Sequence, residues 1–172
     1  ANWDTWDYGS REPLFLPLSE FTEREKDLLV KSNTFCMLPW IHIHGYPDGK
    51  AYPCCLADYN YPVGSLKENT IEEVWRDKPM QQMRENMLAD KPCVECTKCY
   101  EQEKTGFFSM RNSSNQTFGH HIKETLTSDE LKIRYYDIRF SNLCNFSCRS
   151  CGDIFSSNWT KEYKEYGWLP KD

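Results

Sequence analysis

The sequence contains no long apolar run, no block of basic residues and no signal-peptide pattern. A transmembrane helix needs about 18 or more consecutive apolar residues, and nucleic-acid-binding domains cluster Lys and Arg on one face. The net charge is −5 at pH 7, and acidic and basic residues alternate along the chain. We therefore expect a soluble, cytoplasmic protein that binds neither nucleic acid nor a membrane.

Cysteine, in contrast, is abundant and clustered. There are nine cysteines, an odd number, and several are spaced C-x2-C or C-x3-C. Disulfides belong to oxidising compartments, whereas such spacings in a reducing compartment favour metal binding. The sequence therefore predicts one or more metal centres.

The most informative stretch is residues 137–152, an extended segment that runs into the pattern C-x3-C-x2-C. Its cysteines are Cys144, Cys148 and Cys151. Three thiolates can hold three corners of a [4Fe–4S] cube, whereas electron-transfer clusters usually have four cysteine ligands. An iron without a protein ligand can bind a substrate or cofactor, so we interpret the loop as a reaction centre. The alternative is a zinc knuckle, but zinc sites usually have four ligands in C-x2-C pairs.

This segment resembles the cluster loop of the radical S-adenosylmethionine (radical SAM) superfamily, with a first barrel strand and a polar exit at Ser141-Asn142 before the cysteines. The resemblance implies that the open iron binds S-adenosylmethionine and that one electron cleaves it to a 5′-deoxyadenosyl radical. Family members often carry an aromatic residue before the third cysteine, where this chain has Ser150. No catalytic residue beyond the cluster ligands can be assigned.

A complete (β/α)8 barrel needs about 250 residues, and this chain has 172. We therefore expect the front part of a longer enzyme or one half of a split one, inactive alone. Because residue 1 is alanine, we also expect that the start has been processed or cut.

A second group of cysteines lies upstream. The pattern over residues 35–55 predicts a β-hairpin turning at Pro47-Asp48-Gly49, which brings Cys36 and Cys54 together. A C-x2-C pair would complete four thiolates around a [4Fe–4S] cluster or a structural zinc. Two such pairs are available, because Cys93, Cys96 and Cys99 are evenly spaced.

The order of Cys36, Gly49 and Cys54, then a helix with Ile71-Glu72-Glu73-Val74-Trp75, then Cys96-x2-Cys99, resembles the SPASM and twitch modules of radical SAM enzymes. The resemblance implies an auxiliary [4Fe–4S] cluster, in the single-cluster twitch form. Its implied ligands are Cys36, Cys54, Cys96 and Cys99, with Cys93 as the alternative to Cys99. Cys55 is expected to point away. Such modules usually follow the barrel, whereas this one precedes it.

The remaining elements predict an α+β fold, a small hairpin-plus-helices module followed by the first strand, loop and helix of a partial (β/α) barrel. Ser19, or Thr22 with Glu25, can cap a helix over residues 20–31. Thr70 with Glu73 forms a capping box, and Pro79 begins a helix whose Met80, Met83, Met87 and Leu88 form one face. A strand is expected over 133–140, and a last helix should stop at Gly167.

His42 and His44 share one face of the hairpin. A metal role is conceivable, but half-exposed strand positions are the more common reading. The expected division is an N-terminal arm and helix over 1–34 (the arm being 1–18), an auxiliary module over 35–111, a linker over 112–131 and the start of a radical SAM core over 132–172.

The leading hypothesis is a radical SAM oxidoreductase or modifying enzyme with an auxiliary cluster, acting on a peptide, a protein or another small substrate. Its expected partners are the remainder of the barrel, in cis or on a partner chain, and a reductant such as ferredoxin or flavodoxin. One alternative is a non-catalytic iron–sulfur electron-transfer or zinc-binding adaptor. Another is a protein–protein module that uses the aromatic residues.

Overall fold

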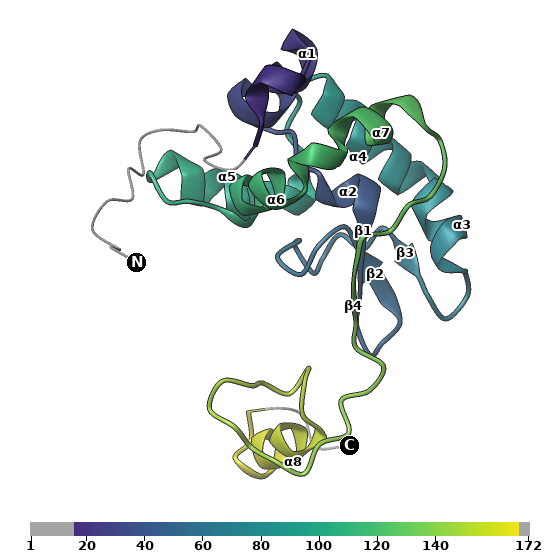
Figure 1. Ribbon diagram of the computed structural model, residues 1–172. Coiled ribbons are helices and arrows are strands. Elements are labelled where there is room, and N and C mark those ends of the chain that lie inside the picture. The colour runs from purple at the N-terminus through teal and green to yellow at the C-terminus, as the bar shows by residue number, and fades with distance from the viewer. Residues whose placement is uncertain (1–15, 169–172) are drawn as a thin grey trace.

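The structure is a computed structural model that describes residues 16–168, so the expected arm of residues 1–18 lies almost wholly outside it. It has the expected α+β class: a four-stranded sheet in the order β3-β2-β1-β4, with helices packed around it. Most helices gather toward one end of the strands, and α8 (Ser157–Glu165) lies beyond the other end (Figure 1).

The hairpin forms, but its first strand is shorter than expected. Pro39 lies in the first turn of a short helix, α2 (Leu38–Ile41), so β1 (His42–Gly45) begins only after it. The chain turns through Gly49, whose φ of 86° favours glycine. It returns antiparallel in β2 (Lys50–Tyr52), which pairs with β3 (Gly64–Ser65).

Two predicted capping boxes are confirmed. Thr22 caps α1 (Glu23–Lys26) by accepting from the Glu25 amide at 3.3 Å, so the helix starts there and not at Ser19. The helix continues as a π-helical turn over Asp27–Lys31. Thr70 caps α3 (Ile71–Arg76) in the same way. Each box satisfies backbone N–H groups that would otherwise lack a partner.

The methionine helix is also confirmed. It is α4 (Lys78–Leu88), which has Pro79 in its first turn. Met80, Met83 and Met87 are fully buried in the core with Phe35, Ile43 and Val74. Their spacing puts them on one helix face, so their role is packing.

The segment expected to be a linker is mostly helical instead. After α5 (Thr97–Lys104) and the break at Gly106, the chain forms α6 (Met110–Phe118), a turn over Gly119–His121 and α7 (Ile122–Thr127). The buried Asn115 accepts from the Met37 amide at 2.9 Å and donates to Phe35 O at 3.0 Å. The polar composition of residues 112–131 suggested a linker, but polar side chains such as that of Asn115 are hydrogen-bonded inside the fold.

Strand β4 (Tyr135–Ile138) lies within the predicted extended segment but has an unexpected neighbour. It pairs in parallel with β1, in the register His42↔Tyr135 to Gly45↔Ile138. The segment expected to begin a barrel thus forms the fourth strand of the upstream module's own sheet. The barrel, and the division into domains, stay predictions.

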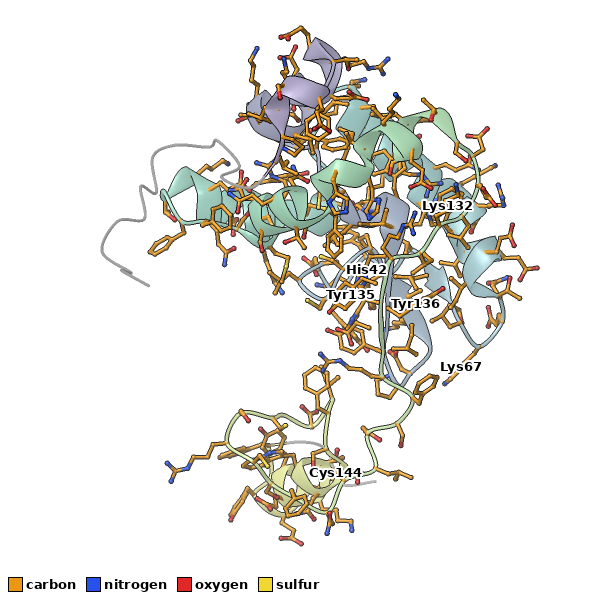
Figure 2. The ribbon with its side chains drawn as sticks, in the orientation of Figure 1. His42, Lys67, Lys132, Tyr135, Tyr136 and Cys144 are labelled. Atoms are coloured by element: carbon orange, nitrogen blue, oxygen red, sulfur yellow. The ribbon has the colours of Figure 1, made fainter. Side chains whose placement is uncertain are left out.

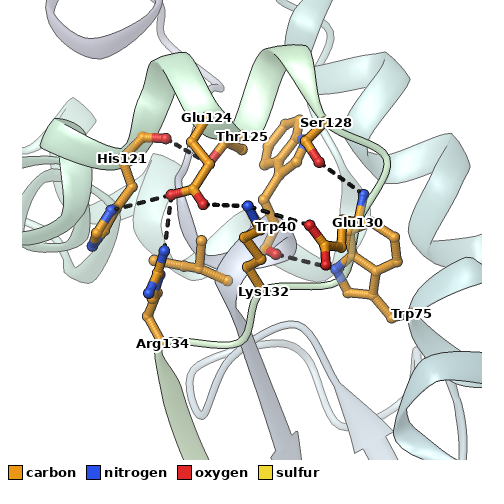
Figure 3. A pocket seen from close by; sticks show the side chains of 10 residues that line it. Trp40, Trp75, His121, Glu124, Thr125, Ser128, Glu130, Lys132 and Arg134 are labelled. Carbon is orange, nitrogen blue, oxygen red and sulfur yellow. Dashed lines mark hydrogen bonds and ion pairs between the residues drawn. The ribbon is translucent and has the colours of Figure 1, made fainter.

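A small pocket between α7 and the approach to β4 contains a cluster of charged side chains (Figure 3). The Glu124 carboxylate lies 2.7 Å from Lys132 Nζ, 2.8 Å from Arg134 Nη2 and 3.7 Å from His121 Nδ1. Lys132 and Arg134 belong to the connection that leads into β4. One carboxylate on α7 therefore fixes the start of that strand.

The two hairpin histidines are not half-exposed as expected, because β4 covers them. His42 is 1% exposed and His44 is 0% exposed. The His42 ring stacks on Tyr135 with 4.3 Å between centroids, and its Nδ1 lies 2.8 Å from Tyr135 O. Figure 2 shows the side chains of His42 and Tyr135 side by side at the upper end of β4. A lone hairpin would leave them open to solvent, so their burial depends on the parallel strand.

No helix within residues 16–168 has the length and apolar character that crossing a membrane requires.

We predict that acid weakens this fold below about pH 6.5. Burial, the largest cause, lowers the pKa of both His42 and His44. The unfolded chain therefore binds more protons, and stability rises with pH in the window between the folded and unfolded pKa values. Each histidine adds a slope of up to about 1.4 kcal/mol per pH unit. Urea unfolding between pH 5 and 8 measures this slope, which replacing both histidines by Gln should reduce. An unchanged slope would assign the acid sensitivity to other groups.

Candidate metal centres

The four cysteines that the upstream resemblance implies as ligands line one small cavity. Cys36, Cys54, Cys96 and Cys99 all contribute to its wall. The remaining lining residues are Leu38, Leu56, Ala57, Glu95, Met110 and Arg111. Cysteines up to 63 positions apart in sequence (99 − 36) therefore meet at one place.

Local structure explains how they meet. Cys36 comes just before α2, and Cys54 lies two residues after β2, so the β1–β2 pairing brings them together. Cys96 ends a 3-10 turn and Cys99 lies in the first turn of α5. The Asp58 amide donates to Glu95 O at 2.9 Å, which joins the loop after Cys54 to the loop before Cys96.

The surroundings of Cys36, Cys54 and Cys96 oppose the charged thiolate. Burial is the largest cause, and it raises the pKa of Cys36 and Cys96 well above the usual range and that of Cys54 to about 12. The neighbouring thiols raise these pKa values further. A positively charged metal centre would offset both effects, and metal binding releases the thiol protons. The site is therefore suited to metal binding and poorly suited to free thiolates.

The structure also adds a residue that the sequence analysis missed. Arg111, on α6, lines the cavity and is 3% exposed. It donates to Phe35 O at 2.9 Å and Ser32 O at 3.1 Å, and it forms an ion pair with Glu103. Burial opposes the charge on Arg111, but Glu103 keeps the pKa of Arg111 above the ordinary value. The Arg111 charge acts to lower the pKa of Cys36. No spacing signal in the sequence connects Arg111 to the cysteines.

The other two cysteines of this region lie elsewhere. Cys93 is buried, but its sulfur lies 3.7 Å from Met83 O, and it does not line the cavity. Cys55 does not line the cavity either, and its pKa is raised first by burial and next by the Asp137 charge. Of the two candidate pairs, Cys96 with Cys99 is the one that faces Cys36 and Cys54.

The downstream cysteines occupy an open loop between β4 and α8, at the opposite end of the molecule from most helices (Figure 2, Cys144). The start of α8 holds the loop backbone. The Cys144 amide donates to Ser157 Oγ at 3.2 Å, and Trp159 Nε1 donates to Cys148 O at 2.9 Å. Cys148 is exposed, and so are the nearby apolar side chains of Phe140, Leu143 and Phe146.

Neither group of cysteines is arranged around a single ion. Within residues 16–168, no three His, Cys, Asp or Glu side chains converge as ligands of one metal. A zinc site would require sulfurs at about 2.3 Å from a common point. The four upstream thiols line one cavity without meeting that geometry.

Comparison with known proteins agrees with this reading of the upstream site. Residues 36–100 match the family model of the SPASM iron–sulfur cluster-binding domain. The match indicates iron–sulfur cluster binding by this segment, and domains of this kind are typical of radical SAM enzymes. No curated protein and no solved structure matched the chain.

We predict that Arg111→Met destabilises the protein by about 3–5 kcal/mol, because the half-buried Glu103 carboxylate loses its ion-pair partner and keeps only the hydrogen bond from the Ser109 hydroxyl. The double variant Arg111→Met/Glu103→Met, which removes both charges, should regain most of that loss. Chemical unfolding followed by tryptophan fluorescence measures both. Equal losses in the single and double variants would mean that the ion pair does not carry the effect.

We also predict that Cys99→Ser lowers the iron bound to the upstream site, whereas Cys93→Ser leaves it unchanged. The reason is that, of these two cysteines, only Cys99 lines the cavity. Iron and acid-labile sulfide per chain measure the difference after anaerobic reconstitution. Loss of iron from the Cys93 variant alone would reverse the assignment.

Proposed function

We propose that this chain carries the cluster-binding part of a radical SAM enzyme. Cys36, Cys54, Cys96 and Cys99 would hold an auxiliary [4Fe–4S] cluster, and Cys144, Cys148 and Cys151 would hold a second. One observation carries the proposal: the four thiols implied by the SPASM resemblance line one cavity, within a segment that matches the SPASM domain.

The residues at the upstream cavity fit a cluster. Soft thiolate ligands are those that iron–sulfur clusters take. Backbone amides favour the charged form of two of the sulfurs. The Leu38 amide does so at Cys36, and the Leu56 and Ala57 amides do so at Cys54. The Arg111 guanidinium adds a positive charge beside the sulfurs. Hydrogen bonds and charge near the sulfurs are among the protein's means of setting a cluster's potential.

The downstream loop fits a cluster with one open iron. It provides three cysteines, and α8 holds the loop by its backbone, leaving Cys148 exposed. When bound, such a cluster supplies the electron for reductive cleavage of S-adenosylmethionine. The chain's own residues bind and orient the group, and the chemistry belongs to the cofactors.

The proposed partners follow from the same reading. The exposed Phe140, Leu143 and Phe146 beside the downstream loop suit burial against the remainder of a barrel, in cis or on a partner chain. A cytoplasmic ferredoxin or flavodoxin would deliver electrons. A peptide or protein is the substrate class that the resemblance favours.

The second candidate is a non-catalytic iron–sulfur electron-transfer or zinc-binding adaptor. Its support is that β4 belongs to the module's own sheet, so the fold of this chain does not depend on a barrel. The family match over residues 36–100 favours a cluster over zinc at the upstream site in either case.

Anaerobic reconstitution tests the proposal. We expect about eight irons with matching sulfide per chain, as two four-iron clusters require. Replacing Cys144, Cys148 and Cys151 by Ala should leave about four. S-adenosylmethionine should alter the electron paramagnetic resonance of one reduced cluster in the parent chain and of none in this variant.

A control variant with Cys36, Cys54, Cys96 and Cys99 replaced by Ala should keep the response to S-adenosylmethionine. Zinc without sulfide in the parent chain would support the adaptor instead. A full complement of clusters that never responds to S-adenosylmethionine would leave electron transfer as the function.

A further inference from the structure

The parallel pairing of β1 and β4 carries a row of matched side chains on one sheet face. Alternate residues of a strand share a face, so His42 and His44 of β1 lie in line, as do Tyr135 and Asp137 of β4. Tyr46 and Arg139 follow the last residues of the two strands. The backbone register sets His42 opposite Tyr135 and His44 opposite Asp137. We call these six residues the polar ladder.

Each step of the polar ladder is a contact. The His42 ring stacks on Tyr135, as described above. His44 Nδ1 lies 2.9 Å from Asp137 Oδ2, although without the alignment of a hydrogen bond. Asp137 Oδ1 lies 3.6 Å from Arg139 Nε, and the Arg139 guanidinium lies 5.9 Å from the Tyr46 ring centroid.

Joining two strands through the polar ladder costs free energy, because polar groups are buried in it. His44 is fully buried, and neither of its ring nitrogens has a hydrogen-bond partner among the described residues. An apolar pair of similar volume would usually be as stable or more so. Buried polar groups are best explained where they select one arrangement among several, and strand register is such a case. A slip of one residue would move Asp137 to the other face of the sheet.

The register of β4 determines where the three-cysteine loop lies. Arg139 continues past the strand and places its guanidinium 4.2 Å from the Phe155 ring centroid. Phe155 stacks on Tyr46 with 5.9 Å between centroids. The loop with Cys144, Cys148 and Cys151 lies between residues 139 and 155. Both ends of the loop are therefore held against the end of β1.

His44 is also the point where the two halves meet. It is opposite Tyr52 on β2, two residues before Cys54, and opposite Asp137 on β4. We propose that His44 and Asp137 are positioning residues that select the register of β4 on β1 and thereby fix the three-cysteine loop relative to the four-cysteine cavity. This inference rests on the proposed function for its meaning, but its geometry does not require bound clusters.

Two variants test the inference. Asp137→Leu removes the carboxylate that lies beside the buried His44 ring, so residues 134–139 should exchange amide hydrogens about tenfold faster or more, while helices α3 and α4 are unchanged. His44→Leu/Asp137→Leu removes both polar groups, so protection should return to within about threefold of the parent chain. Glu68→Leu is the control, since Glu68 is an exposed residue that belongs to neither β1 nor β4.

The double variant separates register selection from packing. It should be protected yet occupy more than one register. In the reconstituted chain, pulsed electron paramagnetic resonance between the two reduced clusters should then give a broadened distance distribution. In the iron-free chain, the amide signals of residues 134–139 should be doubled. A mere packing role predicts one narrow distance and single signals.

The inference is overturned if Asp137→Leu exchanges within about twofold of the parent chain, or if the double variant keeps a single register. Its failure is distinct from failure of the proposed function. Iron and sulfide content decides the clusters, whereas hydrogen exchange and amide signals of the iron-free chain decide the polar ladder.

Discussion

Strand β1 is the element on which both candidate metal centres depend. Its antiparallel pairing with β2 brings Cys54 beside Cys36, and its parallel pairing with β4 carries the chain to the three-cysteine loop. The strand itself spans only His42–Gly45. A change of register on either edge would move one set of cysteines relative to the other, because the side-chain period of a strand is two residues.

So short a strand does not hold two neighbours through backbone hydrogen bonds alone, and the surrounding helices supply the rest. The buried methionines of α4 share one core cluster with Ile43 of β1 and Ala51 of β2. Arg111 and Asn115 of α6 donate hydrogen bonds to the carbonyl of Phe35, just before Cys36. On the other side, Glu124 of α7 fixes Lys132 and Arg134 ahead of β4 (Figure 3). Helices that lie outside both cysteine groups therefore determine where those groups lie.

Local signals in the sequence predicted local structure well. The capping boxes at Thr22 and Thr70 and the methionine spacing of α4 depend on neighbouring residues, so the sequence alone contains what they require. The meeting of Cys36, Cys54, Cys96 and Cys99 was implied by spacing and resemblance, and the structure brings these residues to one cavity. Their role as ligands stays a prediction.

Features that depend on distant partners were not predictable in this way. The polar residues of α6 suggested a linker because composition does not reveal that Asn115 meets Met37 and Phe35. The burial of His42 and His44, likewise, follows from a strand more than ninety residues later, as the 93-residue separation of His42 and Tyr135 shows. Arg111 was missed for the same reason, since its value to the cavity lies in tertiary contacts.

The contrast between the two cysteine groups has a physical meaning. Two of the upstream thiols, Cys36 and Cys99, are buried, the other two are half-buried, and a buried arginine lies beside them, so a cluster there would be largely enclosed by the protein. The downstream thiols lie on an open loop with exposed apolar neighbours, so a cluster there would be open to another molecule. A closed centre suits electron storage and an open one suits chemistry. The same sheet contains the strand that leads to Cys54 and the strand that leads to the three-cysteine loop. It therefore holds the two cysteine groups at a fixed relative position, which electron exchange between two clusters would need.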